Sequence, residues 1–222
     1  MKIKKIAYID PTSELVATIL SSRFKIKIYE YEDGITESDV LLLGVNTQHR
    51  LARSLSNLPI VVFDQHTDMY RGNLKSPGKI SNINWIYWRL KDGSETHLVM
   101  PRYNPLPGIL TIPAENKEKF HIYIVDETKE SIIGNLDNGK SYELKPLSVR
   151  NLETLKKLKK QVSFDFDFLR DVKVEDAIDM LKIIDNERNL YDFWLDEPQD
   201  FETQVENCIS IINANNSQDS NI

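Results

Sequence analysis

The sequence predicts an α/β fold with a mostly parallel sheet, and three observations support this prediction. Short apolar runs alternate with amphipathic stretches along most of the 222 residues, which is the order that repeated strand–helix units produce. Two of the apolar runs end in clusters of acidic residues, and sites in such folds form where strands end. At 41% hydrophobic residues, the chain can bury one sizeable core, so we expect a single domain over residues 1–212.

The strands of the main sheet are expected where short apolar runs occur. They are Ile6–Ile9, Lys25–Tyr31, Val40–Leu43, Pro59–Phe63, Thr96–Met100, Val162–Phe166 and Tyr191–Leu195. Lys25–Tyr31 alternates apolar and polar residues, as a half-buried strand does. Val40–Leu43 is continuously apolar and stops at Gly44, which is typical of a buried strand.

A different pattern runs between residues 119 and 145. His121–Val125, Ser131–Leu136 and Ser141–Leu144 all have strand-like sequences with no helical stretch between them. Asn138-Gly139 is a strong signal for a tight hairpin turn. We therefore predict a small antiparallel β insertion over residues 119–145.

Five helices are expected between the strands. They are Ser13–Ser22, His49–Leu55, Asn151–Lys160, Val174–Ile184 and Phe201–Ile212. Val174–Ile184 is the clearest, because its apolar residues recur at the spacing of one helix face. Cys208 falls in the apolar stripe of the last helix and is expected to be inert packing. The Asn- and Ser-rich residues 213–222 are predicted to be a disordered tail.

Composition restricts the class of partner. The net charge is −6 and no basic face offsets it, so nucleic acid is not expected as the main partner. The single cysteine excludes an internal disulfide framework and fits a reducing compartment. The start of the chain turns polar too soon for a signal peptide, and no run approaches the about 18 apolar residues of a membrane span. We expect a cytoplasmic protein with no membrane partner.

The two acidic motifs predict a metal site. Asp64-Gln65-His66-Thr67-Asp68 follows the apolar run Pro59–Phe63, and Asp165 and Asp167 stand in the later run Ser163–Phe168. If both motifs continued as strands, alternate side chains would share a face and converge. Carboxylates gathered in this way repel one another and are costly to bury, and a bound cation removes that conflict.

The ligand types favour hard divalent ions. When carboxylates dominate and one or two imidazoles complete a site, Mn²⁺ is preferred over Zn²⁺, although other divalent metals can bind. Two ions held about 3.5–4 Å apart by bridging carboxylates can deprotonate a shared water at neutral pH. Asp64 and Asp165 are the residues of this chain that can supply such bridges.

Together the motifs resemble a known family. Asp-x-His-x-Asp after an apolar strand, followed much later by Ser-x-Asp-x-Asp, is similar to the arginase–agmatinase (ureohydrolase) superfamily, and the resemblance runs from Val40 to Leu169. It implies a shortened three-layer α/β/α fold, two Mn²⁺ ions, and hydrolysis of a C–N bond in a guanidino or amidino group. The segments Asn84-Trp85-Ile86-Tyr87-Trp88 and Asp165-Phe166-Asp167-Phe168 also resemble those of an arginase-like branch that includes peptide arginases.

The resemblance implies a role for each ligand. Asp64 and Asp165 would bridge the two ions, and Asp68 would complete the first. His66 and Asp167 would bind the second ion and are the expected catalytic residues, with Asp167 passing a proton to the leaving nitrogen. His49 is similar in placement to the family's upstream histidine and is the candidate for the remaining ligand of the first ion, although the usual Gly-Gly-Asp-His wording is absent.

Substrate recognition departs from the family pattern. The loop after Asp68 lacks the family's histidine; Asn73 and Lys75 stand there instead and are candidates for substrate binding. The family's late glutamate has only approximate counterparts in Asp196 and Glu197. We expect a small-molecule or peptide guanidino substrate, because a short chain leaves an open site. A homo-oligomer is compatible with this interpretation.

Two other functions fit the same residues. The departures in the loop and at the late glutamate favour a catalytically degenerate protein that binds metal or a partner. An amide deacetylase on the same scaffold would instead use one Zn²⁺ and a general-base histidine. The two remaining histidines, His97 and His121, lie in strand patterns; we interpret them as structural and without an acidic partner.

Overall fold

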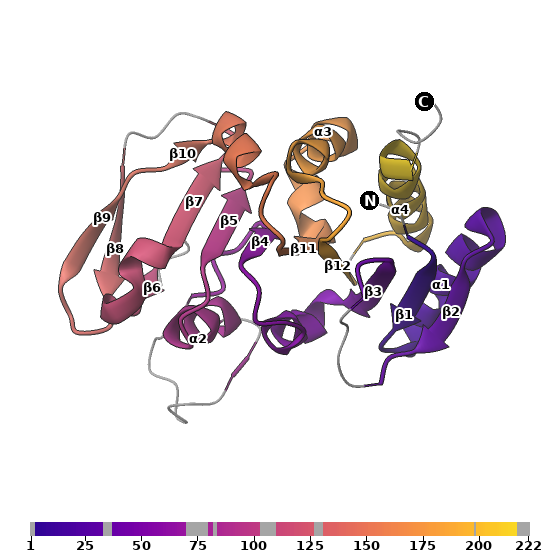
Figure 1. The fold of residues 1–222 in the computed structure, drawn as a ribbon, viewed down its shortest axis with the longest axis horizontal. Coiled ribbons are helices and arrows are strands. Elements are labelled where there is room, and N and C mark those ends of the chain that lie inside the picture. The colour runs from indigo at the N-terminus through magenta and orange to yellow at the C-terminus, as the bar shows by residue number, and fades with distance from the viewer. Residues whose placement is uncertain are drawn as a thin grey trace.

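The structure is a computed structural model, and its core is a nine-strand parallel sheet (Figure 1). It describes residues 3–32, 37–69, 80–81, 84–102, 110–126, 131–197 and 199–216. Within these ranges the strand order is β10-β7-β5-β4-β11-β12-β3-β1-β2, and every neighbouring pair is parallel. The strands are β1 Lys5–Tyr8, β2 Lys27–Glu30, β3 Val40–Val45, β4 Ile60–Phe63, β5 Thr96–Met100, β7 Phe120–Ile124, β10 Leu147–Ser148, β11 Gln161–Asp165 and β12 Leu190–Leu195.

Helical elements cover both faces of the sheet and make a three-layer α/β/α arrangement. The α-helices are α1 Pro11–Phe24, α2 Trp85–Lys91, α3 Val174–Ile184 and α4 Phe201–Asn216. The 3₁₀ helices are η1 Asn46–Ser54, η2 Ala114–Lys119, η3 Val149–Leu155 and η4 Phe166–Arg170. Buried residues of α1, α3 and α4 pack on one face, and those of η1 and α2 on the other. The predicted fold class is therefore confirmed.

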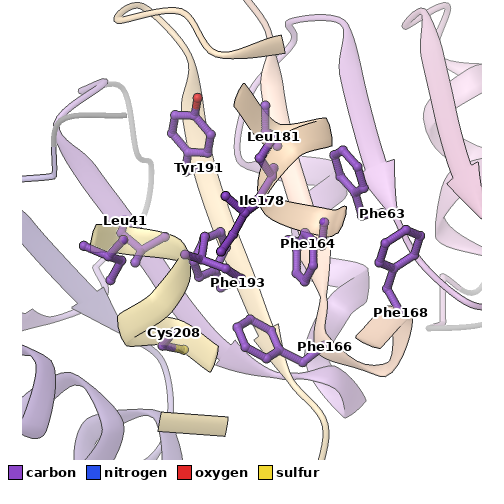
Figure 2. Close-up of a cluster of buried hydrophobic side chains, with 14 of the residues drawn as sticks. Leu41, Phe63, Phe164, Phe166, Phe168, Ile178, Leu181, Tyr191, Phe193 and Cys208 are labelled. Atoms are coloured by element: carbon purple, nitrogen blue, oxygen red, sulfur yellow. The ribbon is translucent and has the colours of Figure 1, made fainter. Parts of the chain in front are cut away.

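Alternation along the strands explains why both faces are apolar. In β11, Val162 and Phe164 point toward α3 and α4, whereas in β12 Trp194 points toward the opposite layer. Figure 2 shows the core on the α3 and α4 side, where Phe164 lies among the rings of Phe63 and Phe193. Such two-sided burial is typical of a parallel sheet. As predicted, Cys208 is buried in this core.

The predicted β insertion at 119–145 is only partly correct. β7, which was assigned to the insertion, joins the main sheet in parallel with β5. A separate three-strand sheet contains β6 Thr111–Ile112, β8 Ile132–Leu136 and β9 Ser141–Leu144. Its β8–β9 hairpin is antiparallel, and Gly139 takes φ = +85° in the turn, where glycine carries no steric penalty.

One helix was missed, and two helix predictions need correction. α2 was not predicted, because Trp85–Lys91 is short and apolar on most sides. The helix predicted over Asn151–Lys160 is instead the 3₁₀ helix η3, which runs over Val149–Leu155. α4 continues to Asn216, so residues 213–216 are helical and not part of a disordered tail. None of the helices in the described ranges is long and apolar enough to cross a membrane.

The order of the central strands creates the place for a site. β3 and β4 are consecutive strands in the main sheet, but β11 and β12 lie between them. The sheet therefore grows in opposite directions from β3 and from β4, and crevices form at such switch points beyond the carboxyl ends of the strands. Both acidic motifs lie at this edge, directly after β4 and at the end of β11.

Candidate metal centre

The two acidic motifs meet because their strands are neighbours. β4 and β11 pair in parallel, with Phe63 opposite Phe164. Asp64 follows Phe63 and Asp165 follows Phe164, so both carboxylates lie at the carboxyl ends of the two neighbouring strands. Both are buried, at 1% and 4% exposure. Their meeting confirms the prediction that residues far apart in the sequence form one cluster.

His49 closes one side of the cluster. It lies on η1, directly after β3, and is 1% exposed. Its Nδ1 lies 3.2 Å from Asp165 Oδ2, 3.4 Å from Asp64 Oδ2 and 3.9 Å from Asp68 Oδ2. Although three carboxylate oxygens surround this nitrogen, it makes no hydrogen bond. A buried nitrogen with acidic neighbours and no hydrogen bond marks a position where a cation would satisfy all four groups.

His66 closes the other side. Its Nδ1 lies 2.8 Å from Asp167 Oδ2 and 3.5 Å from Asp64 Oδ1. The two oxygens of Asp64 therefore face different histidines: Oδ2 faces His49 and Oδ1 faces His66. Two groups with ligand spacing result, His49–Asp64–Asp165 and Asp64–His66–Asp167. Each group has ligand atoms close enough to hold a metal ion, and the two groups share Asp64.

The convergence comes from turns rather than from strand alternation. β4 ends at Phe63 and β11 ends at Asp165, where η4 begins, so the expectation that each motif continues as a strand is wrong. Backbone amides instead hold the carboxylates: the amides of His66 and Asp167 donate to Asp64 Oδ1 and Asp165 Oδ1 at 2.7 and 3.0 Å. The chain can reverse within a few residues in this way and keep the oxygens pointed inward.

Asp68 is held at the rim of the cluster by a strained backbone. Its φ of +46° lies in the left-handed region, which non-glycine residues rarely adopt without a compensating contact. Here Trp85 Nε1 donates a hydrogen bond to Asp68 Oδ2. The bond orients the carboxylate toward His49 and gives Trp85 a role in the site as well as in the core.

Burial and the close approach of charged groups shift the pKa values of the clustered side chains. Burial raises the pKa of Asp64 to about 7, and repulsion from Asp167 adds to this effect. Burial also raises the pKa values of Asp165 and Asp68 well above their usual range. Hydrogen bonds that His66 donates to the Asp167 and Asp64 carboxylates raise the pKa of His66 to about 11. Such shifts are expected where several carboxylates are buried close together, and a bound cation would offset their repulsion.

A buried hydrogen-bond chain orients His49, and the sequence did not reveal it. His49 Nε2 lies 3.0 Å from Ser163 Oγ, and Ser163 donates to Asp192 Oδ1. Trp194 Nε1 and Gln161 Nε2 also donate to the Asp192 carboxylate. When His49 donates from Nε2, its Nδ1 presents a lone pair to the cluster, as a metal-ligating histidine requires. The one signal in the sequence was an aspartate inside the apolar strand β12.

The predicted substrate residues have different fates. Asp196 is fully buried, and its two oxygens accept from Arg170 Nε and a terminal guanidinium nitrogen at 2.7 Å each. Asn46 Nδ2 also donates to it, at 3.1 Å. Glu197 is exposed. Asn73 and Lys75 lie outside the described residues.

Comparison with other proteins does not add to this picture. No model of a known protein family matches the chain, and no curated protein sequence matches it significantly. The candidate metal centre therefore rests on its own geometry. Three aspartates and two histidines form two groups whose ligand atoms are close enough to hold a metal ion, and Asp68 Oδ2 lies 3.9 Å from His49 Nδ1.

Proposed function

We propose that the protein is a hydrolase with two metal ions, and that its substrate carries a guanidino or amidino group. The observation that carries the proposal is the position of Asp64, whose two oxygens face two separate His/Asp groups. One carboxylate shared in this way is the usual means of keeping two ions close together. The hydrogen-bond-free Nδ1 of His49 is the second support.

The ligand set favours Mn²⁺. Carboxylate oxygens outnumber imidazole nitrogens, with Asp64, Asp68, Asp165 and Asp167 against His49 and His66. Oxygen-rich sites suit Mn²⁺ better than Zn²⁺, which prefers nitrogen and sulfur ligands. When bound, two such ions lower the pKa of a water and polarise the group that it attacks.

The side chains can carry the proton. Asp167 Oδ2 contacts His66 Nδ1, and Asp167 Oδ1 accepts from the amide of Gln65 at 3.1 Å. These contacts fix the Asp167 carboxylate, so it can accept a proton from the attacking water and pass it to the leaving nitrogen. The side chain of His66 is 47% exposed, so a substrate can reach it from solvent, whereas His49 and Asp165 are buried.

The substrate class rests on the resemblance of the two acidic motifs to the arginase–agmatinase superfamily. Arginine, agmatine and peptides that contain arginine are the substrates to test. Asp196 is already occupied by a guanidinium from within the chain, that of Arg170. Glu197, which is exposed, is therefore the better candidate for a substrate contact.

The Arg170–Asp196 pair also supports a second candidate, a protein that binds metal or a partner without turnover. If Asp196 were the substrate carboxylate, Arg170 would have to leave it first. Two parallel charge-assisted hydrogen bonds to a buried carboxylate resist such a change. On this view the metal centre would be structural, or it would dock a partner.

Metal analysis and urea release distinguish these functions. We expect about two Mn²⁺ per chain after dialysis, release of urea from one of the three substrates, and loss of both in Asp165→Asn. Asp179→Asn, an exposed change on α3, is the control and should behave as wild type. One Zn²⁺ with deacetylase activity would indicate the alternative enzyme, and metal binding without urea release would favour the non-catalytic protein. No binding at millimolar Mn²⁺ would disprove the proposal.

A further inference from the structure

A second group of potential metal ligands lies near the amino ends of strands β5 and β7, whereas the carboxylate centre lies at the carboxyl ends of the strands. His97 and His121 are register partners on the adjacent parallel strands β5 and β7, so they stand side by side. Glu95 precedes β5 and lies two residues before His97. The expectation that these histidines have no acidic partner is wrong, because the Glu95 carboxylate reaches both.

The distances between the ligand atoms are those of a metal site. Glu95 Oε1 lies 3.1 Å from His97 Nε2 and 3.5 Å from His121 Nε2. Ligands at about 2.0–2.1 Å from a tetrahedral Zn²⁺ ion are about 3.3 Å from one another. The three atoms also lie close enough together to serve one ion. The two imidazole rings are stacked, with centroids 4.7 Å apart. The Nε2 atoms of both rings lie near Glu95 Oε1.

His97 gives an independent indication of a ligand. It is 3% exposed, yet its Nε2 makes no hydrogen bond, although Glu95 Oε1 is within range. The other ring nitrogen, Nδ1, is 3.2 Å from the hydroxyl of the buried Tyr123. A metal-ligating histidine typically has one nitrogen fixed by a hydrogen bond and the other free to bind the ion.

The site also has a cationic neighbour. The buried Lys160 lies close enough to His97 for its charge to act on the imidazole. The ammonium of Lys160 opposes a second cation, but the carbonyls of Leu155 and Leu158 hold it at 2.9 and 3.1 Å. We therefore expect a site of modest affinity that fills only with a well-matched ion.

We propose that Glu95, His97 and His121 form a mononuclear site for Zn²⁺ or a similar borderline divalent ion. Two imidazoles and one carboxylate are a donor set that suits Zn²⁺ and leaves a fourth position for water. Glu95 and His121 are 42% and 33% exposed, so the ion can enter from solvent. By joining β5 to β7, it would tie the outer strands to the centre of the sheet.

This site is separate from the carboxylate centre. Val61 and His97 are register partners on β4 and β5. Asp64 lies three residues after Val61, just beyond the end of β4. At about 3.3 Å per residue the two positions are about 10 Å apart along the strands. The sites also differ in chemistry, since one is rich in imidazole and the other in carboxylate. Their variants can therefore be tested independently.

The test compares zinc binding by matched variants with the carboxylate centre already filled by Mn²⁺. Glu95→Gln and His121→Gln change partly exposed ligands, so neither opens the core, and Glu118→Gln alters an exposed carboxylate nearby as the control. Zn²⁺ content after equilibrium dialysis, far-UV circular dichroism and the melting temperature are measured for each protein.

We expect wild type and Glu118→Gln to retain one Zn²⁺ more per chain than Glu95→Gln and His121→Gln. The two ligand variants should bind that ion at least tenfold more weakly and lose the zinc-dependent rise in melting temperature. Co²⁺ substituted at the site should absorb as a tetrahedral ion in wild type and Glu118→Gln, and not in the two ligand variants. Equal zinc content and affinity in all four folded proteins would overturn the proposal. These variants leave Asp64 and Asp165 unchanged. A negative result would therefore overturn the zinc site alone and would not bear on the proposed hydrolase.

Discussion

Replacing Asp64 by asparagine should have opposite effects with and without metal. Asp64 is 1% exposed and lies among Asp165, Asp167 and two histidines. Without a cation its negative charge is unfavourable, because burial and repulsion raise its pKa to about 7. Asparagine has nearly the same shape and no charge. Asp64→Asn should therefore stabilise the metal-free protein and remove the stabilisation that metal provides.

The size of the effect follows from the pKa. At about 1.4 kcal/mol per pKa unit, a value of about 7 against the ordinary 3.8 corresponds to about 4 kcal/mol of free energy lost to ionisation above pH 8. The buried amide of asparagine needs new partners, and incomplete hydrogen bonding costs about 1–2 kcal/mol. The net gain should then be about 2–3 kcal/mol, which raises the melting temperature of a chain of this length by roughly 4–12 °C.

Thermal unfolding at pH 8, with chelator and with excess Mn²⁺, measures both effects. Wild type should gain about 3 kcal/mol from Mn²⁺ at a hundred times its dissociation constant, whereas Asp64→Asn should gain little. Asp179→Asn, whose side chain is 74% exposed in wild type, controls for the loss of one negative charge. The reasoning is refuted if Asp64→Asn destabilises the metal-free protein and Mn²⁺ stabilises both proteins equally.

Three further predictions address the support of the centre, its titration and the core. Ser163→Ala removes the partner of His49 Nε2 and should weaken Mn²⁺ binding roughly 10–100-fold in calorimetric titrations; an unchanged dissociation constant would contradict the role of this contact. The metal-free protein should lose stability as pH rises, because the folded state holds protons that the unfolded state releases: Asp64 acts between its ordinary pKa of 3.8 and about 7, and His66 between 6.5 and about 11. Urea unfolding across this pH range checks the sign, and a stability that rises with pH would be inconsistent with it. Phe164→Ala removes a fully buried ring and should cost about 3–5 kcal/mol of unfolding free energy in urea, whereas a loss below 1 kcal/mol would show that the core adjusts to the cavity.

The sequence predicted elements best where their pattern is local. Thr96–Met100, Ser141–Leu144 and Val174–Ile184 occupy the predicted residues, because apolar periodicity and the breaks around these segments identify them without knowledge of their neighbours. β7 was placed in the wrong sheet because the choice of pairing partner depends on the whole fold. Similarly, the short helix α2 is stabilised by what it packs against, and its sequence has no clear periodicity.

The candidate ligands of the carboxylate centre were predicted from the sequence, from the chemistry of acidic residues that follow apolar strands and, for His49, from the resemblance to a known family. Only the tertiary structure decided how these residues meet. It showed that Asp64 faces two histidines, that Arg170 occupies Asp196, and that Glu95 joins His97 and His121. These facts depend on turns and strand pairing, because contacts of a few ångströms between distant residues are set by the packing of the whole sheet and not by local sequence.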